Sequence, residues 1–296
     1  MRMAAAMALG TLGVGLAHLL TRFLGRRLED EYVEYPHGPT TRLDWLPIRP
    51  ILSRKTLPAA ASFTVRKADI ILGTLLSYWR IGIHEFPKAN SQYIDKFVRG
   101  EDAMYWHWLP PYETKNQSLW CGAFATIGFG AAGLKRDIRQ KALASTARVQ
   151  EWLDGTGRYK GDPHKDRRVF ARNSKHTYGR LEDIRPGDLV VVGKGDKSAG
   201  NHIATALATP FDLDKKTLSD IIPRDVLAAV PKAVWGKFLA RRGLLLIEGN
   251  ASGYGPDGKK YEGVVVQFRP TIENREKPKQ QAIMHAVRFK PEDYAT

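Results

Sequence analysis

One cysteine, Cys121, stands among the 296 residues of the chain, in the stretch SLWCGAF, where a loop is expected to turn into an apolar, Gly/Ala-rich helix. The N-terminus of a helix carries partial positive charge, which stabilises a thiolate over a thiol. The outward-pointing N–H groups of a helix start can also hold a developing oxyanion. Cys121 is therefore expected in a setting that suits a nucleophile, although a lone cysteine in an apolar helix is more often a packing residue.

A thiol nucleophile also needs a base and a group that orients the base. His202 begins an expected strand directly after the Gly-rich loop GKGDKSAG, and imidazole has a pKa near neutrality. Glu248 and Asn250 lie at the end of the next expected strand, where period-two geometry would point both to the same side. Either side chain could orient the imidazole. We therefore predict a catalytic group of Cys121, His202, Glu248 and Asn250.

The elements that must position these residues change in character along the chain. Apolar periodicity predicts helices in the first half, and short apolar runs bounded by turn residues predict strands in the second half. Because helices come first and an antiparallel-looking sheet follows, the expected fold class is α+β. The expected helices are 63–79, 90–98, 121–133 and 141–153, the expected strands are 189–192, one from 201, 244–248, 263–269 and 283–289, and a helical insertion is expected at about 209–243.

Six pieces of the sequence follow one another in an order that resembles a known family. They read GIHEFPKANSQYIDKFV, LWCGAF, RPGDLVVV, NHIATALA, IEGNASGYG and GVVVQFR. This succession, from Lys67 to Pro270, resembles the CHAP (cysteine, histidine-dependent amidohydrolase/peptidase) family within the papain-like NlpC-type group. The resemblance implies a papain-like fold, with N-terminal helices packed on a small antiparallel sheet. By position it implies that Cys121 is the nucleophile, that His202 is the base, and that Glu248 and Asn250 complete the set.

The same resemblance implies a reaction and a substrate. Proteins of this kind cleave amide bonds of peptidoglycan, as an endopeptidase or as an N-acetylmuramoyl-L-alanine amidase. We expect the backbone N–H of Cys121 and Gln117 to hold the oxyanion. We also expect substrate contacts from Trp120 and from Trp106 and Trp108 in an aromatic loop, since aromatic faces stack on sugars. No cofactor is expected, and no HExxH motif or clustered carboxylate/His set predicts a metal site.

The composition bounds the partners. The formal net charge of +15 predicts attraction to polyanions, among which are anionic cell-wall polymers, acidic membrane surfaces and nucleic acid. The basic residues are scattered and no nucleic-acid-binding motif is present, so no specific nucleic acid partner is expected. Two other classes stay open. One is a catalytically silent papain-like module of a phage particle or a membrane-associated assembly, and the other is a basic nucleic-acid-binding protein.

The N-terminus carries an apolar run from Met3 to Leu20, with arginines on both sides. The run is compatible with a membrane anchor, a cleaved signal or a packing helix, and it provides a potential membrane contact. The expected organisation is a helix at 1–27, an extended linker at 28–66 and a hydrolase domain at 67–296. The expected location is the cell envelope, by anchoring or export, or a phage particle.

Overall fold

The computed structural model describes residues 66–84, 120–143, 145–172, 177–194 and 202–295. All of them lie within the second of the two units into which the chain divides, Pro39–Thr296. The expected N-terminal helix, almost all of the 28–66 linker, the 90–98 helix and the aromatic loop lie outside the described residues. Among the residues that are described, no helix is long and apolar enough to span a membrane.

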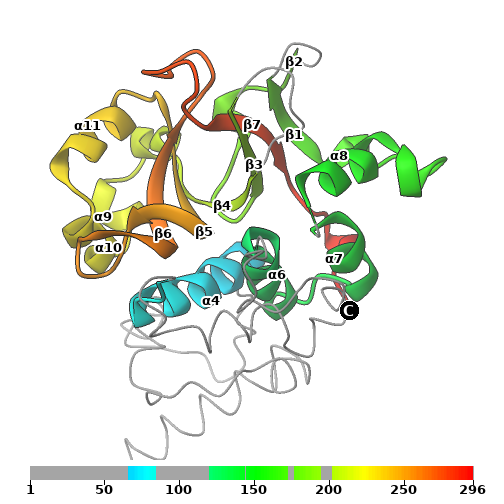
Figure 1. Cartoon of the computed structure of the whole chain (residues 1–296), viewed down its shortest axis with the longest axis horizontal. Coiled ribbons are helices and arrows are strands. Elements are labelled where there is room, and N and C mark those ends of the chain that lie inside the picture. The colour runs from blue at the N-terminus through cyan, green and yellow to red at the C-terminus, as the bar shows by residue number, and fades with distance from the viewer. Residues whose placement is uncertain (1–65, 85–119, 144, 173–176, 195–201, 296) are drawn as a thin grey trace, which may run out of the picture. The chain divides into compact units, whose positions relative to one another are not determined.

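The described part of the chain forms one seven-stranded antiparallel sheet with helices packed against it, which confirms the α+β class (Figure 1). The strand order is β2-β1-β7-β3-β4-β5-β6, so the last strand of the chain lies in the middle of the sheet. The strands are β1 Arg168–Arg172, β2 Thr177–Tyr178, β3 Leu189–Gly193, β4 His202–Ala208, β5 Gly243–Tyr254, β6 Lys260–Pro270 and β7 Ala282–Val287.

Strands β3 to β7 confirm the five strands expected from the sequence, although β6 begins three residues before its expected start, β7 ends two residues before its expected end, and β5 differs most. β5 was expected to end at Glu248, before the Gly-rich stretch NASGYGPDG, but it continues to Tyr254. The pairing with β6 shifts register between Glu248 and Ala251 and then resumes, with Ala251 opposite Gly263. Backbone hydrogen bonds to β6 therefore extend the strand through residues whose own preference is for a loop. The short strands β1 and β2 were not anticipated.

Two helices lie against the sheet, α6 (Cys121–Ala131) on β4 and β5 and α4 (Lys67–Ile81) on β6. The two helices also pack against each other (Figure 1). Their contact is close, because a Cβ added at Gly128 would lie 2.8 Å from Cγ of Leu75. α6 in turn packs against β4 and β5. A helix buried on so many sides matches its apolar, Gly/Ala-rich sequence, and it fixes where residue 121 must lie.

Helix α6 ends at Ala131, two residues before the predicted end, and Gly133 makes the turn that stops it. Gly133 has φ of 81°, and the backbone N–H of Leu134 donates to the carbonyl of Phe129 at 2.9 Å. This is a left-handed helix end that glycine adopts without strain.

The prediction of a single helix at 141–153 is wrong. Two helices occupy the region, α7 Arg136–Ala142 and α8 Thr146–Asp154. Ser145 lies between them and its hydroxyl accepts a hydrogen bond from the backbone N–H of Arg148 at 3.3 Å, which is the geometry of a helix N-cap.

Between β4 and β5 the chain leaves the sheet and returns through short helices. Pro223 and Pro231 stand directly before two of them, at positions where the fixed φ of proline suits a helix start. The helices are α9 Leu218–Ile221, α10 Arg224–Ala229 and α11 Lys232–Leu239.

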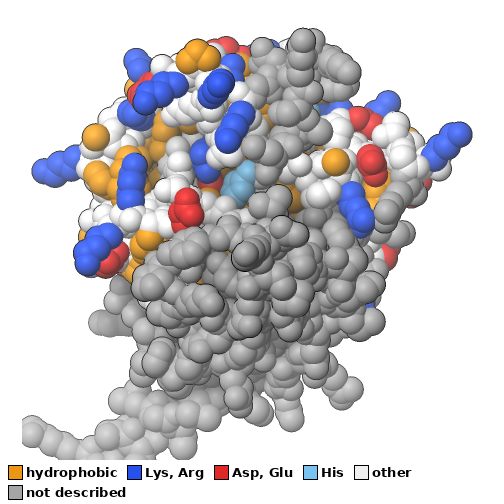
Figure 2. Space-filling view, in the orientation of Figure 1, with side chains coloured by type: hydrophobic (Ala, Val, Ile, Leu, Met, Phe, Trp, Pro, Cys, Tyr) orange, Lys and Arg blue, Asp and Glu red, His pale blue; other side chains and the backbone are white. Residues whose placement is uncertain are grey.

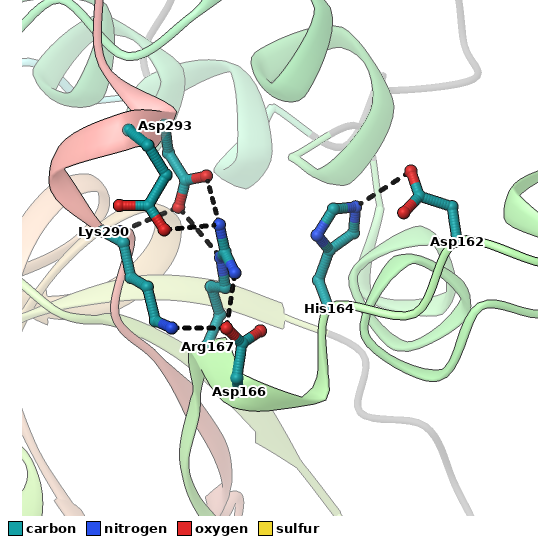
Figure 3. A network of polar contacts seen from close by, with 7 residues as sticks. Asp162, His164, Asp166, Arg167, Lys290 and Asp293 are labelled. Atoms are coloured by element: carbon teal, nitrogen blue, oxygen red, sulfur yellow. Dashed lines mark hydrogen bonds and ion pairs between the residues drawn. The ribbon is translucent and has the colours of Figure 1, made fainter.

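Two clusters of charged side chains hold together the segments that lie just before β1, just before β3 and just after β7. Asp188, in the turn RPGD, accepts the backbone N–H of Arg185 at 2.8 Å and pairs with both sides of the Arg288 guanidinium fork. Figure 3 shows a second cluster, in which Arg167 contacts Asp293 near the C-terminus and Asp166 beside it. These contacts tie the C-terminal segment to the chain before β1, so they have a structural role.

Candidate functional site

Cys121 is the first residue of α6, and its side chain is only 8% exposed. The sulfur accepts hydrogen bonds from two backbone N–H groups, that of Gly122 in the first turn of the helix and that of Ile203 in β4. The thiol therefore lies at the positive end of an 11-residue helix, as the sequence predicted.

His202 is the first residue of β4 and is 6% exposed. Its ring is hydrogen-bonded to the Cys121 sulfur.

The pairing of β4 with β5 runs from Ala208 only to Thr205, which lies opposite Ile247. Beyond Thr205 the two strands part. The N–H of Ile203, which a continued ladder would use, bonds the sulfur instead, so the thiol lies at the point where the two strands separate.

Glu248 completes a row of three side chains. It is fully buried, and its Oε2 lies 3.0 Å from Nε2 of His202. The contact is an ion pair without hydrogen-bond alignment, because the Nε2–H does not point at an acceptor within the described part of the chain. Since Nε2 faces the carboxylate, Nδ1 is the ring nitrogen that remains for the sulfur. The structure thus brings together Cys121, His202 and Glu248.

A fourth charged residue, Arg269 in β6, was not identified from the sequence. Its Nε donates to Oε1 of Glu248 at 2.8 Å, and its Nη2 donates to Oε2 at 2.6 Å. Arg269 lies opposite Leu244 in the β5–β6 pairing, whereas Glu248 lies opposite Val265. The sequence signal for this contact is an arginine at the end of the mostly apolar stretch GVVVQFR.

The protonation states follow from these neighbours. Burial alone would raise the pKa of the Cys121 thiol, but the charge of His202 and the hydrogen bonds to the sulfur bring this pKa below its usual value. Burial would lower the pKa of His202, but the charges of Cys121 and Glu248 outweigh it and raise this pKa to about 9. Both shifts favour the ion pair of thiolate and imidazolium over the neutral pair of thiol and imidazole.

Glu248 is held as an anion despite its burial. Burial would raise the pKa of its carboxyl, but the charge and the two hydrogen bonds of Arg269, followed by the charge of His202, lower it to about 2. The carboxylate is therefore available to His202 as an orienting anion over the whole physiological range.

The expectation that Glu248 and Asn250 point to the same side relied on regular alternation, and this premise is wrong. The register shift between Glu248 and Ala251 interrupts the alternation, and Asn250 has φ of 56°, in the left-handed region. Glu248 contacts the imidazole, with its Oε2 3.0 Å from Nε2 of His202. A catalytic role for Asn250 stays a prediction.

The expected substrate contacts receive little support. Trp120 is fully buried and packs edge-to-face on Phe124, with ring centroids 6.3 Å apart, and its contact with a substrate stays a prediction. Gln117, Trp106 and Trp108 lie outside the described residues. Within the described ranges, no group of three or more His, Cys, Asp or Glu side chains is placed to hold a metal ion.

Gly249 explains how the helix start comes so close to β5. A Cβ built there would lie 2.6 Å from Cβ of Phe124 and 2.6 Å from the Trp120 ring. No side chain fits between the strand and α6 at this point. The glycine of the EGN stretch is thus required by packing.

Comparisons with protein-family models, with curated proteins and with solved structures find no match to this chain. The chemistry of the site is therefore inferred from its geometry.

We predict that Gly249→Ala destabilises the protein by about 1–3 kcal/mol and lowers the reactivity of Cys121, because the added methyl group must push α6 away from β5. Thermal unfolding and thiol labelling measure the two effects. Gly236→Ala in α11 is the matched control, because a Cβ there meets nothing within 4 Å. Equal behaviour of the two variants would contradict the packing argument.

We predict that iodoacetamide alkylates the folded protein with a pH midpoint below the ~8.5 of an ordinary thiol. Since the chain has one cysteine, labelling reports on Cys121 alone. The thiolate fraction rises as pH increases through the lowered pKa of Cys121, so at any given pH below the midpoint the folded protein should react faster than an ordinary thiol. The denatured chain is the control and should return to the ordinary midpoint. A folded midpoint equal to the denatured one would mean that the thiol is not activated.

Proposed function

We propose that this protein is a papain-like cysteine hydrolase that cleaves amide bonds. The observation that carries the proposal is the row of Cys121, His202 and Glu248, in which the thiol lies at a helix N-terminus and is hydrogen-bonded to the imidazole. This is the set of groups that nucleophilic catalysis by cysteine requires: a thiolate, a proton carrier and an anion that orients the carrier.

The reaction would proceed in two halves. In the first, the Cys121 thiolate attacks the amide carbon, and the oxyanion is held by the Cys121 backbone N–H, which lies at the helix start without an intrahelical acceptor. His202 donates its proton to the departing amine as the C–N bond breaks, which leaves a thioester. In the second, His202 takes a proton from water, the hydroxide displaces the sulfur, and the acid product leaves.

The proposed substrate is peptidoglycan, cut at a peptide bond or between the muramyl lactyl group and L-alanine. Support comes from the ordered resemblance to CHAP proteins in the sequence and from the net charge of +15, which favours an anionic wall. Figure 2 shows Lys and Arg side chains spread over the visible face of the sheet and its helices, with fewer Asp and Glu among them. A location at the cell envelope or in a phage particle belongs to the same proposal.

One observation favours a second candidate function. Cys121 and His202 are only 8% and 6% exposed, so the closed site offers little surface to a polymeric substrate. A catalytically silent module of the same fold, used for binding within a phage particle or a membrane-associated assembly, would tolerate this burial. The two candidates differ in whether any amide bond is cleaved.

We expect the full chain to clear purified peptidoglycan in a zymogram and expect Cys121→Ala and His202→Ala to lose this clearing, by at least about 100-fold in a turbidity assay. Circular dichroism must first show that the variants fold. Equal clearing by wild type and Cys121→Ala would refute the proposed mechanism. Wall binding without clearing by any form would select the silent module.

We expect kcat/KM to show a bell-shaped pH dependence. The acidic limb reports loss of the thiolate as pH falls through the lowered pKa of Cys121. The alkaline limb should lie near pH 9, where His202 loses the proton that it must donate. Soluble muropeptide substrates keep wall binding out of the measurement. An alkaline limb near pH 6.5 would show that His202 is not held as an imidazolium.

A further inference from the structure

Arg269 has no part in the reaction steps above, yet it makes the strongest contacts to the site. Its side chain is 9% exposed, and its guanidinium donates to both oxygens of Glu248, at 2.8 and 2.6 Å. A bidentate pair of this kind fixes the carboxylate in position and in plane.

The charges of the site balance only when Arg269 is counted. The thiolate of Cys121 and the carboxylate of Glu248 carry two negative charges, and the imidazolium of His202 supplies one positive charge. Arg269 supplies the second, so the buried row of four groups is neutral. Without it, the same row would carry a net charge of −1 away from water, which is a costly state that proton uptake would relieve.

The carboxylate is shared unequally between its two partners. Oε2 of Glu248 lies 2.6 Å from Nη2 of Arg269 and 3.0 Å from Nε2 of His202, and only the first contact is aligned as a hydrogen bond. Arg269 also binds Oε1 of Glu248, so the arginine holds the carboxylate at two points and the imidazolium meets it at one.

We propose that Arg269 is a positioning residue of this site, which holds Glu248 ionised and in place and thereby keeps His202 charged beside the Cys121 thiolate. The inference rests on the proposed role of Cys121 as nucleophile. The charged groups that act on one another here come from four elements: Cys121 of α6, His202 of β4, Glu248 of β5 and Arg269 of β6.

The experiment compares two arginines of matched geometry in the full chain. Arg288 also donates two hydrogen bonds to a buried carboxylate of the same sheet, Asp188, at 2.9 and 2.7 Å, but it belongs to the structural cluster described above. Arg269→Gln and Arg288→Gln each remove a positive charge and the pair of guanidinium N–H donors that binds the carboxylate. For each variant, the pH midpoint of Cys121 alkylation by iodoacetamide is measured together with the thermal unfolding midpoint.

Both variants should unfold at a lower temperature than wild type, but only Arg269→Gln should change the thiol. Removal of a nearby positive charge makes the thiolate less favourable, so the alkylation midpoint should rise by about 1 pH unit or more. Arg288→Gln should leave the midpoint unchanged. Arg269→Lys keeps the charge and loses the fork, so its midpoint should stay within about half a unit of wild type.

An unchanged midpoint in folded Arg269→Gln would overturn the proposal and leave Arg269 as a structural residue. If Arg269→Gln does not fold, Arg269→Lys decides: a midpoint near that of wild type supports the proposal, and a rise of about 1 unit contradicts it. Because alkylation needs no substrate, the same measurement distinguishes failure of the proposed function from failure of the role of Arg269. An ordinary thiol midpoint in wild type would contradict the role of Cys121 as nucleophile. A low midpoint in both wild type and Arg269→Gln would contradict only the role of Arg269.

Discussion

The buried contact between Cys121 and His202 is the interaction on which the rest of the site depends. A thiolate and an imidazolium that are both almost fully buried must compensate one another, because either charge alone would be lost to a shifted pKa. Glu248 and Arg269 extend the compensation to a row of four alternating charges. The row crosses from α6 through β4 and β5 to β6, so the chemistry proposed for the sulfur depends on the registration of three strands.

The start of α6 lies against the sheet at the point where β4 and β5 separate, and two features of the sheet make this possible. β4 and β5 separate beyond Thr205, and the N–H of Ile203 that this separation releases is used by the sulfur. Gly249 removes the side chain that would otherwise keep α6 away from β5. A local defect in the sheet is thus what creates the site, which agrees with the frequent occurrence of bulges beside functional residues.

Much of this arrangement could be predicted from the sequence, and the remainder could not, for identifiable reasons. Cys121 and His202 stood at expected element starts, where side chains lie at the end of a helix or strand and can meet. Arg269 could not be paired with Glu248, because it lies opposite Leu244 rather than opposite Glu248, and no local pattern shows that the two side chains meet across that offset. The register shift between Glu248 and Ala251 overturned the expected alignment of Asn250. The continuation of β5 to Tyr254 likewise required β6 as a partner.

The central claim is that His202 is an imidazolium beside a thiolate at neutral pH. Nitrogen NMR of the full chain, with ¹⁵N-labelled histidine and His202→Ala for assignment, tests this claim directly. Both ring nitrogens of His202 should carry protons at pH 7, the ring should titrate near pH 9, and this titration should move to lower pH when Cys121 is replaced by alanine. A neutral ring at pH 7 that titrates near 6.5 in both proteins would rule out the imidazolium.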